Sequence, residues 1–286
     1  MNEIKDGWFI QQDRSCPGVR FSLRVREIVE KQGGFTLFRT DACGLVLTDQ
    51  GMVRYAENDA PFREMTVHCA AFAHEEPRRA LILRGEDGSL AEELLRQRSV
   101  EQIDIWEENE ELTALASRRL PRAGHALSDP RVERCSMPLE HLLKKHAGLC
   151  DLIYADFPES VTAVHSYLRL LKQALRPEGI LTVSAASLFQ APDRTGKLYA
   201  AMKKLFAHTA CAQMPSTIRP GGAALICTGS DVFDGARPVR RPMRLLSRRF
   251  QAYSTPAHKA VFAATMSLPF FREKEEEAES GMVAYE

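Results

Sequence analysis

The 286-residue sequence contains no apolar run of the length that a membrane-spanning helix needs. Its first residues, MNEIKDGWFIQQDR, also lack the apolar core of a signal peptide. We therefore expect a soluble, cytoplasmic protein with no membrane partner.

Two further absences limit the function. Lys+Arg and Asp+Glu both number 38, so the chain has no net charge that would attract nucleic acid or an anionic membrane. The seven cysteines are widely spaced and include no C-x-x-C pair. We expect them to be reduced and buried, without a disulfide framework or a zinc site, and we predict no metal site.

The chain changes pattern near residue 60. Before it, stretches such as FTLFRT and CGLVLTDQGMVRYA read as hairpin strands. From Arg78 onward, compact apolar runs alternate with amphipathic segments, which predicts an α/β fold with a mostly parallel, Rossmann-like sheet covered on both faces. We place a β-rich module at residues 1–58, the α/β domain at 59–272 and a charged tail at 273–286.

Acidic residues follow several strands of the predicted sheet, where ligands of parallel sheets bind. Asp87 follows the first strand, Glu107 the second, and Asp156 and Glu159 the fourth. We expect an acidic crevice suited to a cationic ligand. Glu107 lies about twenty residues after the glycine-containing turn, the spacing of an acid that binds ribose hydroxyls.

Several residues allow more than one interpretation. Asp156 and Asp87 can each cap the helix that follows, since Asp is a favoured N-cap residue. Glu64 either accepts from a backbone amide or belongs to the site. The arginine-rich segment 237–249 either binds RNA or an acidic partner, or forms a solvated edge strand; its interleaved prolines favour the strand.

Over most of its length the sequence resembles the spermidine synthase (polyamine aminopropyltransferase) family. LILRGEDG resembles the family's Gly-Gly-Gly-Asp-Gly loop, IDIWEEN its ribose-binding strand end, and LIYADFPE its catalytic strand with Asp-x-x-Asp. FREM, DPRVE, MPSTIRPGG and AYSTPAHKAVFA resemble further motifs in the family's order.

The resemblance implies a methyltransferase-like fold and the transfer of an aminopropyl group from decarboxylated S-adenosylmethionine to putrescine, giving spermidine and methylthioadenosine. Asp156 would be the proton acceptor and Glu159 the second acid of the pair. Asp87 would bind amines, Glu107 the donor's ribose, and Gly85 the donor through its backbone turn. It implies no cofactor beyond the donor as co-substrate, and a homodimer or homotetramer assembled through the N-terminal hairpins.

The sequence also departs from the family pattern. Arg84 and Glu86 replace the first and third glycines of the loop, Arg63 replaces the family's His, and Ile218 replaces a Tyr. Two alternatives therefore stay open: an S-adenosylmethionine-dependent transferase acting on another amine, and a catalytically silent relative.

Overall fold

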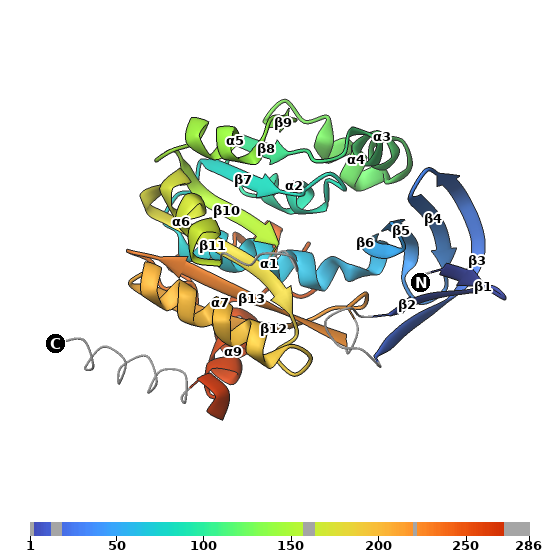
Figure 1. Cartoon of the computed structure of the whole chain (residues 1–286). Coiled ribbons are helices and arrows are strands. Elements are labelled where there is room, and N and C mark those ends of the chain that lie inside the picture. Colours follow the sequence, from blue (N-terminus) through green and yellow to red (C-terminus); the bar gives the residue numbers. More distant parts are fainter. Residues whose placement is uncertain (1–2, 13–18, 157–163, 220–221, 272–286) are drawn as a thin grey trace.

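The computed structural model describes residues 3–12, 19–156, 164–219 and 222–271, which form two sheets around a shared core (Figure 1). Within these residues, the first six strands pair in chain order as an antiparallel sheet. They are β1 (Glu3–Lys5), β2 (Trp8–Gln12), β3 (Arg20–Gln32), β4 (Phe35–Thr40), β5 (Gly44–Asp49) and β6 (Met52–Ala56). The sequence from Val19 to Val29 is compatible with either a strand or a helix, and the structure shows its residues from Arg20 onward as part of strand β3.

The second sheet has, in the described part of the chain, seven strands in the order β12-β13-β11-β10-β7-β8-β9. They are β7 (Arg79–Leu83), β8 (Gln102–Trp106), β9 (Val132–Cys135), β10 (Cys150–Asp156), β11 (Leu175–Ala186), β12 (His208–Pro215) and β13 (Ala223–Ser230). Strands β11 to β9 are parallel, whereas β13 and β12 are antiparallel additions. The order reverses between β7 and β10, which creates the crevice where such folds bind ligands.

Helices cover both faces of this sheet, as the alternating pattern predicted (Figure 1). They are α1 (Ala60–Ala73), α2 (Ser89–Leu94), α3 (Glu110–Arg119), α4 (Pro121–Leu127), α5 (Leu139–Lys145), α6 (Val164–Ala174) and α7 (Pro192–Leu205). Ala80 and Ile82 of β7 pack with α1 to α4, and Leu81 and Leu83 with α5 to α7. Neighbouring side chains of one strand therefore fill two different cores, since they point to opposite faces.

The N-terminal sheet packs on the core that contains α1. Leu37, Leu47 and Tyr55 share one buried cluster with Val67 of α1 and Ile82. The 3-10 turn η1 (Glu57–Asp59) leads directly from β6 into α1. This packing holds β6 beside the end of β7, and so makes the first sheet one wall of the crevice.

Two sequence-based boundaries were wrong. The segment HSYLRLLKQALRPEG (165–179) predicts a helix that stops at its Pro-Glu-Gly, but α6 ends at Ala174 and β11 begins at Leu175. Pro177 explains the early end, because the residue before a proline avoids the helical conformation. The arginine-rich segment forms a loop and the one-turn helix α8 (Arg244–Ser247) instead of an edge strand, and α9 (Thr255–Met266) follows.

The cysteine prediction was also partly wrong. Cys211 and Cys227 form a disulfide, whereas four other described cysteines are free and buried. The two bonded residues are directly opposite in the β12–β13 register, with Cα atoms 4.2 Å apart. A separation of 16 residues in sequence does not reveal that register.

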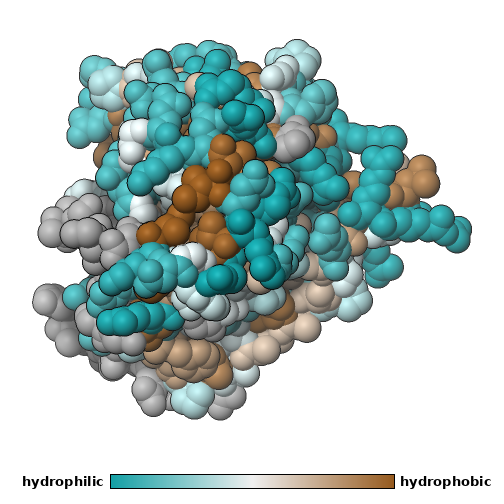
Figure 2. Space-filling model, turned by 90° about the vertical axis from the view of Figure 1, so that its right-hand side faces the viewer, coloured by the Kyte–Doolittle hydropathy of each residue, from teal (hydrophilic) through white to brown (hydrophobic). Residues whose placement is uncertain are grey.

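Figure 2 shows the side of the molecule that carries the N-terminal sheet, where hydrophilic residues surround a central hydrophobic strip. Trp8 and Ile28 of that sheet are 42% and 50% exposed. The homodimer or homotetramer and the cytoplasmic location stay predictions. Among the described residues, no helix combines the length and apolarity needed to cross a membrane.

Candidate active site

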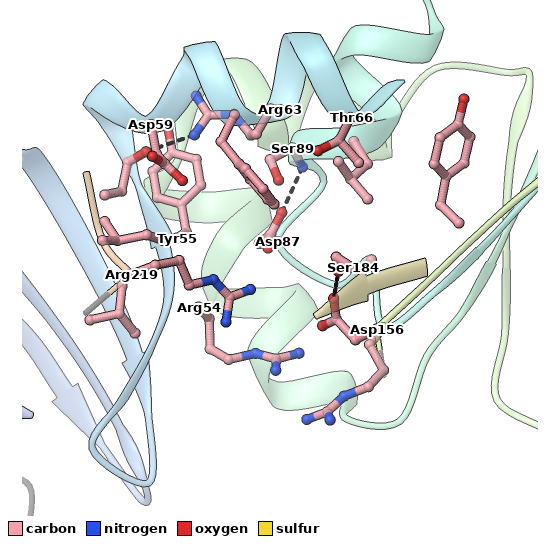
Figure 3. Close-up of a pocket in the computed structure, with 18 of the residues that line it drawn as sticks. Arg54, Tyr55, Asp59, Arg63, Thr66, Asp87, Ser89, Asp156, Ser184 and Arg219 are labelled. Atoms are coloured by element: carbon pink, nitrogen blue, oxygen red, sulfur yellow. Dashed lines mark hydrogen bonds between the residues drawn. The ribbon is translucent and has the colours of Figure 1, made fainter. Parts of the chain in front are cut away.

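A pocket lies at the reversal point of the large sheet, between the carboxyl ends of β7, β10 and β11 on one side and β6 and α1 on the other (Figure 3). Asp156, Asp87 and Gly85 all line it. The structure thus brings together three of the predicted site residues from two strand ends that are about seventy residues apart in sequence. Glu159 lies outside the described residues.

Asp156 is the last residue of β10 and pairs in register with Ser184 of β11. Ser184 Oγ donates a hydrogen bond to Asp156 Oδ1, which fixes the direction of the carboxylate. Burial would raise the pKa of Asp156, but the charges of Arg219 and Arg54, the Ser184 hydrogen bond and the charge of Arg84 together lower it below its ordinary value. Asp156 is therefore a carboxylate at neutral pH.

Asp87 has a structural role as well as its place in the pocket. Its Oδ1 accepts from Ser89 N at 2.7 Å, which orders the turn into α2. Gly88, the N-cap of α2, has φ +72°, a conformation that favours glycine. Asp87 therefore precedes the N-cap residue and is not the N-cap itself, but one of its oxygen atoms accepts the first amide of α2 while the residue also lines the pocket.

Packing around Gly85 leaves no room for a side chain at this position. An added Cβ would lie 2.7 Å from Ile82 Cγ2, a buried side chain of β7. Arg84, just before it, has φ +64°. The arginine that replaces the first glycine of the resembled loop thus has a left-handed backbone, a conformation that favours glycine.

Glu107 follows β8 and is buried at the next strand end, outside the residues that line the pocket. Its amide donates to Cys135 O at 2.9 Å, and Arg134 Nη1 lies 3.7 Å from its Oε1. That Oε1 is buried and accepts no hydrogen bond within the described residues. This buried carboxylate oxygen can still accept a hydrogen bond, and its predicted bond to ribose hydroxyls stays a prediction.

The acidic crevice expected from the strand ends is not what the structure shows. Among the described lining residues, four arginines face three carboxylates: Arg54, Arg63, Arg84 and Arg219 against Asp59, Asp87 and Asp156. Figure 3 shows Arg54 and Arg219 extending toward Asp156. The strand ends do not reveal most of these side chains, because they come from β6, α1 and the segment before β13, far away in sequence.

Arg63 stabilises the junction of β6 and α1. Its Nη1 and Nη2 donate to Ala56 O at 2.7 Å and Glu57 O at 3.2 Å, and the guanidinium lies 5.1 Å from the centre of the Tyr55 ring. Its buried Nε has no hydrogen-bond partner in the described structure. Arg63 therefore holds the pocket wall and still offers one donor.

The residues with two interpretations are now resolved in part. Glu64 faces away from this pocket and accepts from the backbone amides of residues 251–253.

Asp104, Glu133 and Cys135 have ligand atoms within 4.8 Å of one another. Asp104 already accepts from His146 Nε2 at 3.0 Å and Gln102 Nε2 at 2.8 Å, so this cluster reads as an ion-pair network.

Comparison with known proteins agrees with the resemblance. A family model described as spermine/spermidine synthase domain matches residues 60–232. Spermidine synthase of Dictyostelium discoideum is 26% identical over 96% of this chain and 99% of its own. Putrescine N-methyltransferase 3 of Nicotiana tabacum is 29% identical over 66% of this chain and 52% of its own length.

A solved structure supports the fold. Spermidine synthase from Thermotoga maritima superposes with a TM-score of 0.80, covering 96% of each chain at 21% identity. At this identity the likeness shows a shared fold, which confirms the predicted Rossmann-like domain with its N-terminal β-rich part.

Proposed function

The chain belongs to the spermine/spermidine synthase family, and we propose that it transfers a group from the sulfonium of an S-adenosyl donor to an amine. The form that the family relation favours is aminopropyl transfer from decarboxylated S-adenosylmethionine to putrescine, giving spermidine and methylthioadenosine. The observation that supports this best is the position of Asp156, an oriented carboxylate at the reversal point of the sheet and in one pocket with Asp87.

The chemistry needs few protein groups. The amine nitrogen attacks the methylene beside the sulfonium, the C–N bond forms, and the C–S bond breaks with its electron pair passing to sulfur. A neutral thioether leaves, so we expect that no metal or further cofactor is required. An alkylamine with a pKa of about 10 arrives protonated, and a proton must therefore leave its nitrogen for the lone pair to react.

Asp156 is the proposed acceptor of that proton. Ser184 holds its carboxylate in place, so orientation supplies part of the rate enhancement. We propose that Asp87 pairs with an ammonium group of the donor and that Glu107 binds the ribose. Glu159, the second acid implied by the family motif, keeps its proposed substrate-binding role.

Methyl transfer from intact S-adenosylmethionine is a second candidate. A relative named putrescine N-methyltransferase is as similar in identity as the spermidine synthase relative, over two thirds of this chain. The pocket can serve either reaction, because both place a carbon beside a sulfonium in line with an amine.

The test combines binding and turnover. Methylthioadenosine, decarboxylated S-adenosylmethionine and the intact compound should be titrated against the protein's melting temperature. A ligand present at about a hundred times its dissociation constant stabilises the folded state by roughly 2.7 kcal/mol. If none of the three ligands raises the melting temperature, the chain has no nucleoside site, and the catalytically silent relative is favoured.

Asp156→Asn tests the base. It should lower kcat by roughly 10²- to 10⁴-fold, the usual contribution of a general base, while methylthioadenosine still raises the melting temperature. Asp193→Asn, an exposed substitution in the first turn of α7, is the matched control and should leave kcat unchanged. Equal activity in Asp156→Asn and the wild type would exclude this residue as the proton acceptor.

A further inference from the structure

Guanidinium groups surround the proposed base from three directions. Arg54 comes from β6, Arg84 from the turn after β7, and Arg219 from the segment before β13. Figure 3 shows the first and last of these directed to the side of the pocket where Asp156 lies. All three act on the Asp156 carboxylate strongly enough to contribute to its lowered pKa. Diamines carry ammonium groups, so a site built only for diamines would present carboxylates beside Asp156 instead of guanidinium groups.

The carboxylates nearest to Arg54 and Arg84 do not form hydrogen bonds with these arginines. Arg54 Nη2 lies 3.8 Å from Glu86 Oε2, beyond hydrogen-bond distance. Arg84 Nε lies 3.2 Å from Glu108 Oε2, a side chain that is 54% exposed, and the pair lacks hydrogen-bond geometry. Such pairs contribute little to stability. The guanidinium groups therefore keep donors available for a ligand.

Arg84 occupies its position against a local backbone preference. Its φ of +64° is a conformation that costs an L-residue with a side chain more than it costs glycine. Strain of this kind persists where surrounding structure or function maintains it. The fold would accept glycine here, so the arginine is explained better by what its guanidinium binds.

Several buried polar atoms of the residues that line the pocket form no hydrogen bond within the described structure. Thr66 Oγ1, Thr182 Oγ1, Arg63 Nε and Arg84 Nε are buried and have no hydrogen-bond partner within the described residues. All four residues line the same pocket. Buried polar groups are normally paired, so these atoms point to a polar ligand with several acceptors. Carboxylate oxygens supply such acceptors.

We propose that the substrate reacting beside Asp156 carries a carboxylate as well as an ammonium group, and that Arg54, Arg84 and Arg219 bind that carboxylate. The inference rests on the proposed group transfer and names its substrate class, an amino acid or an amino acid moiety. Arginine pairs with carboxylates through parallel N–H donors, and Asp87 and Asp156 match the ammonium. A diamine would place its second ammonium near guanidinium groups, which disfavours it.

The carboxylate can belong to the acceptor or to the donor. Ornithine is putrescine with one added carboxylate, and S-adenosylmethionine differs from its decarboxylated form in the same way. Four reactions, each donor with each acceptor, therefore separate the sources. Products should be measured by mass spectrometry, as methylthioadenosine or S-adenosylhomocysteine together with the modified amine.

We expect at least one carboxylate-bearing compound to exceed its decarboxylated counterpart tenfold or more in kcat/KM. A preference within the acceptor pair assigns the carboxylate to the acceptor, and one within the donor pair assigns it to the donor. Highest activity with decarboxylated S-adenosylmethionine and putrescine would overturn this inference and leave the group-transfer function supported. Absence of both turnover and nucleoside binding would overturn both.

Two variants test the arginines directly. Arg84→Gly restores the residue that the backbone prefers, and Arg54→Gln keeps most of the side-chain length. Each should raise KM for the carboxylate-bearing substrate by about 10- to 100-fold, the range for one charge-assisted contact, and should change KM for the decarboxylated counterpart much less. Equal effects on both compounds would contradict carboxylate binding.

A matched control and a folding control complete the design. Arg237→Gln removes a guanidinium that is 84% exposed outside the pocket and should leave both KM values unchanged. Gln50→Gly relieves a comparable left-handed backbone, φ +49°, in the β5–β6 hairpin. Melting temperatures of Arg84→Gly and Gln50→Gly at or above the wild-type value would show that the substrate effect of Arg84→Gly does not come from misfolding.

Discussion

Glu64 gives a sharp test of how the C-terminal part of the chain is held. The side chain is 1% exposed on α1, and its carboxylate accepts from Gln251 N at 2.9 Å, Ala252 N at 2.8 Å and Tyr253 N at 3.2 Å. Arg96 Nη1 lies 3.4 Å from Oε1. One buried carboxylate thus satisfies three consecutive backbone amides just before α9.

Glu64→Gln is the perturbation to make, because the amide has nearly the same shape. One carboxylate oxygen becomes an NH₂ group that cannot accept, and the remaining oxygen is neutral. At least one backbone amide then loses its partner and the others bond a weaker acceptor. With about 1.5–3 kcal/mol per hydrogen bond to a charged group, we expect a loss of roughly 2–4 kcal/mol.

Thermal unfolding followed by circular dichroism measures this loss. At roughly 2 °C per kcal/mol for a chain of this size, the melting temperature should fall by about 4–8 °C. Glu101→Gln is the control, since Glu101 is 68% exposed and pairs with Arg78 on the surface, so its melting temperature should match the wild type.

A Glu64→Gln protein that melts within about 1 °C of the wild type would refute this argument. Loss of activity at an unchanged melting temperature would instead place Glu64 in the active site, the alternative that the sequence left open. The expected pattern is the reverse: reduced stability, with KM and kcat close to wild type at temperatures where the variant is folded.

Three further outcomes are expected. Glu107→Gln should weaken methylthioadenosine binding by about tenfold or more in calorimetry, since a charged acceptor for ribose hydroxyls is lost; unchanged affinity would remove Glu107 from the site. His146 bonds acceptors through both ring nitrogens, and the hydrogen bond to Asp104 raises its pKa. A group with a raised folded-state pKa stabilises below its unfolded pKa of about 6.5 and loses this effect as pH rises. The stability gap between wild type and His146→Gln in urea unfolding should therefore be larger at pH 6 than at pH 8.5, and a gap that grows with pH would contradict the assignment. Gly85→Ala should destabilise the fold by about 1–3 kcal/mol because its Cβ would overlap Ile82, and an unchanged melting temperature would show that the turn has room.

The elements that could be predicted from sequence are those with a local cause. Each buried strand of the large sheet is a compact apolar run, and Asp156 was identified because it ends such a run. The turn after β7 was expected from the glycines of the LILRGEDG motif, and the structure adds that Arg84 in it has a left-handed backbone. In each case the sequence within a few residues determines the structure.

The features that sequence reasoning missed depend on register and on contacts between distant segments. The Cys211–Cys227 disulfide follows from the β12–β13 register. The start of β11 at Leu175, five residues before the apolar run ILTVSAAS, depends on its pairing with β10. Glu64 was ambiguous because its backbone partners are nearly two hundred residues away in sequence.

The charge of the pocket was the most consequential error, and its cause bears on function. Strand ends supply Asp87 and Asp156, and these alone suggest a cation site. The wall opposite them comes from β6 and from the segment before β13, which add Arg54 and Arg219. A ligand meets both walls at once, so a substrate with charges of both signs fits the assembled pocket better than one chosen from the acidic residues alone. The fold connects this chain to its family, whereas under our proposal its choice of substrate depends on Arg54 and Arg219 of the second wall.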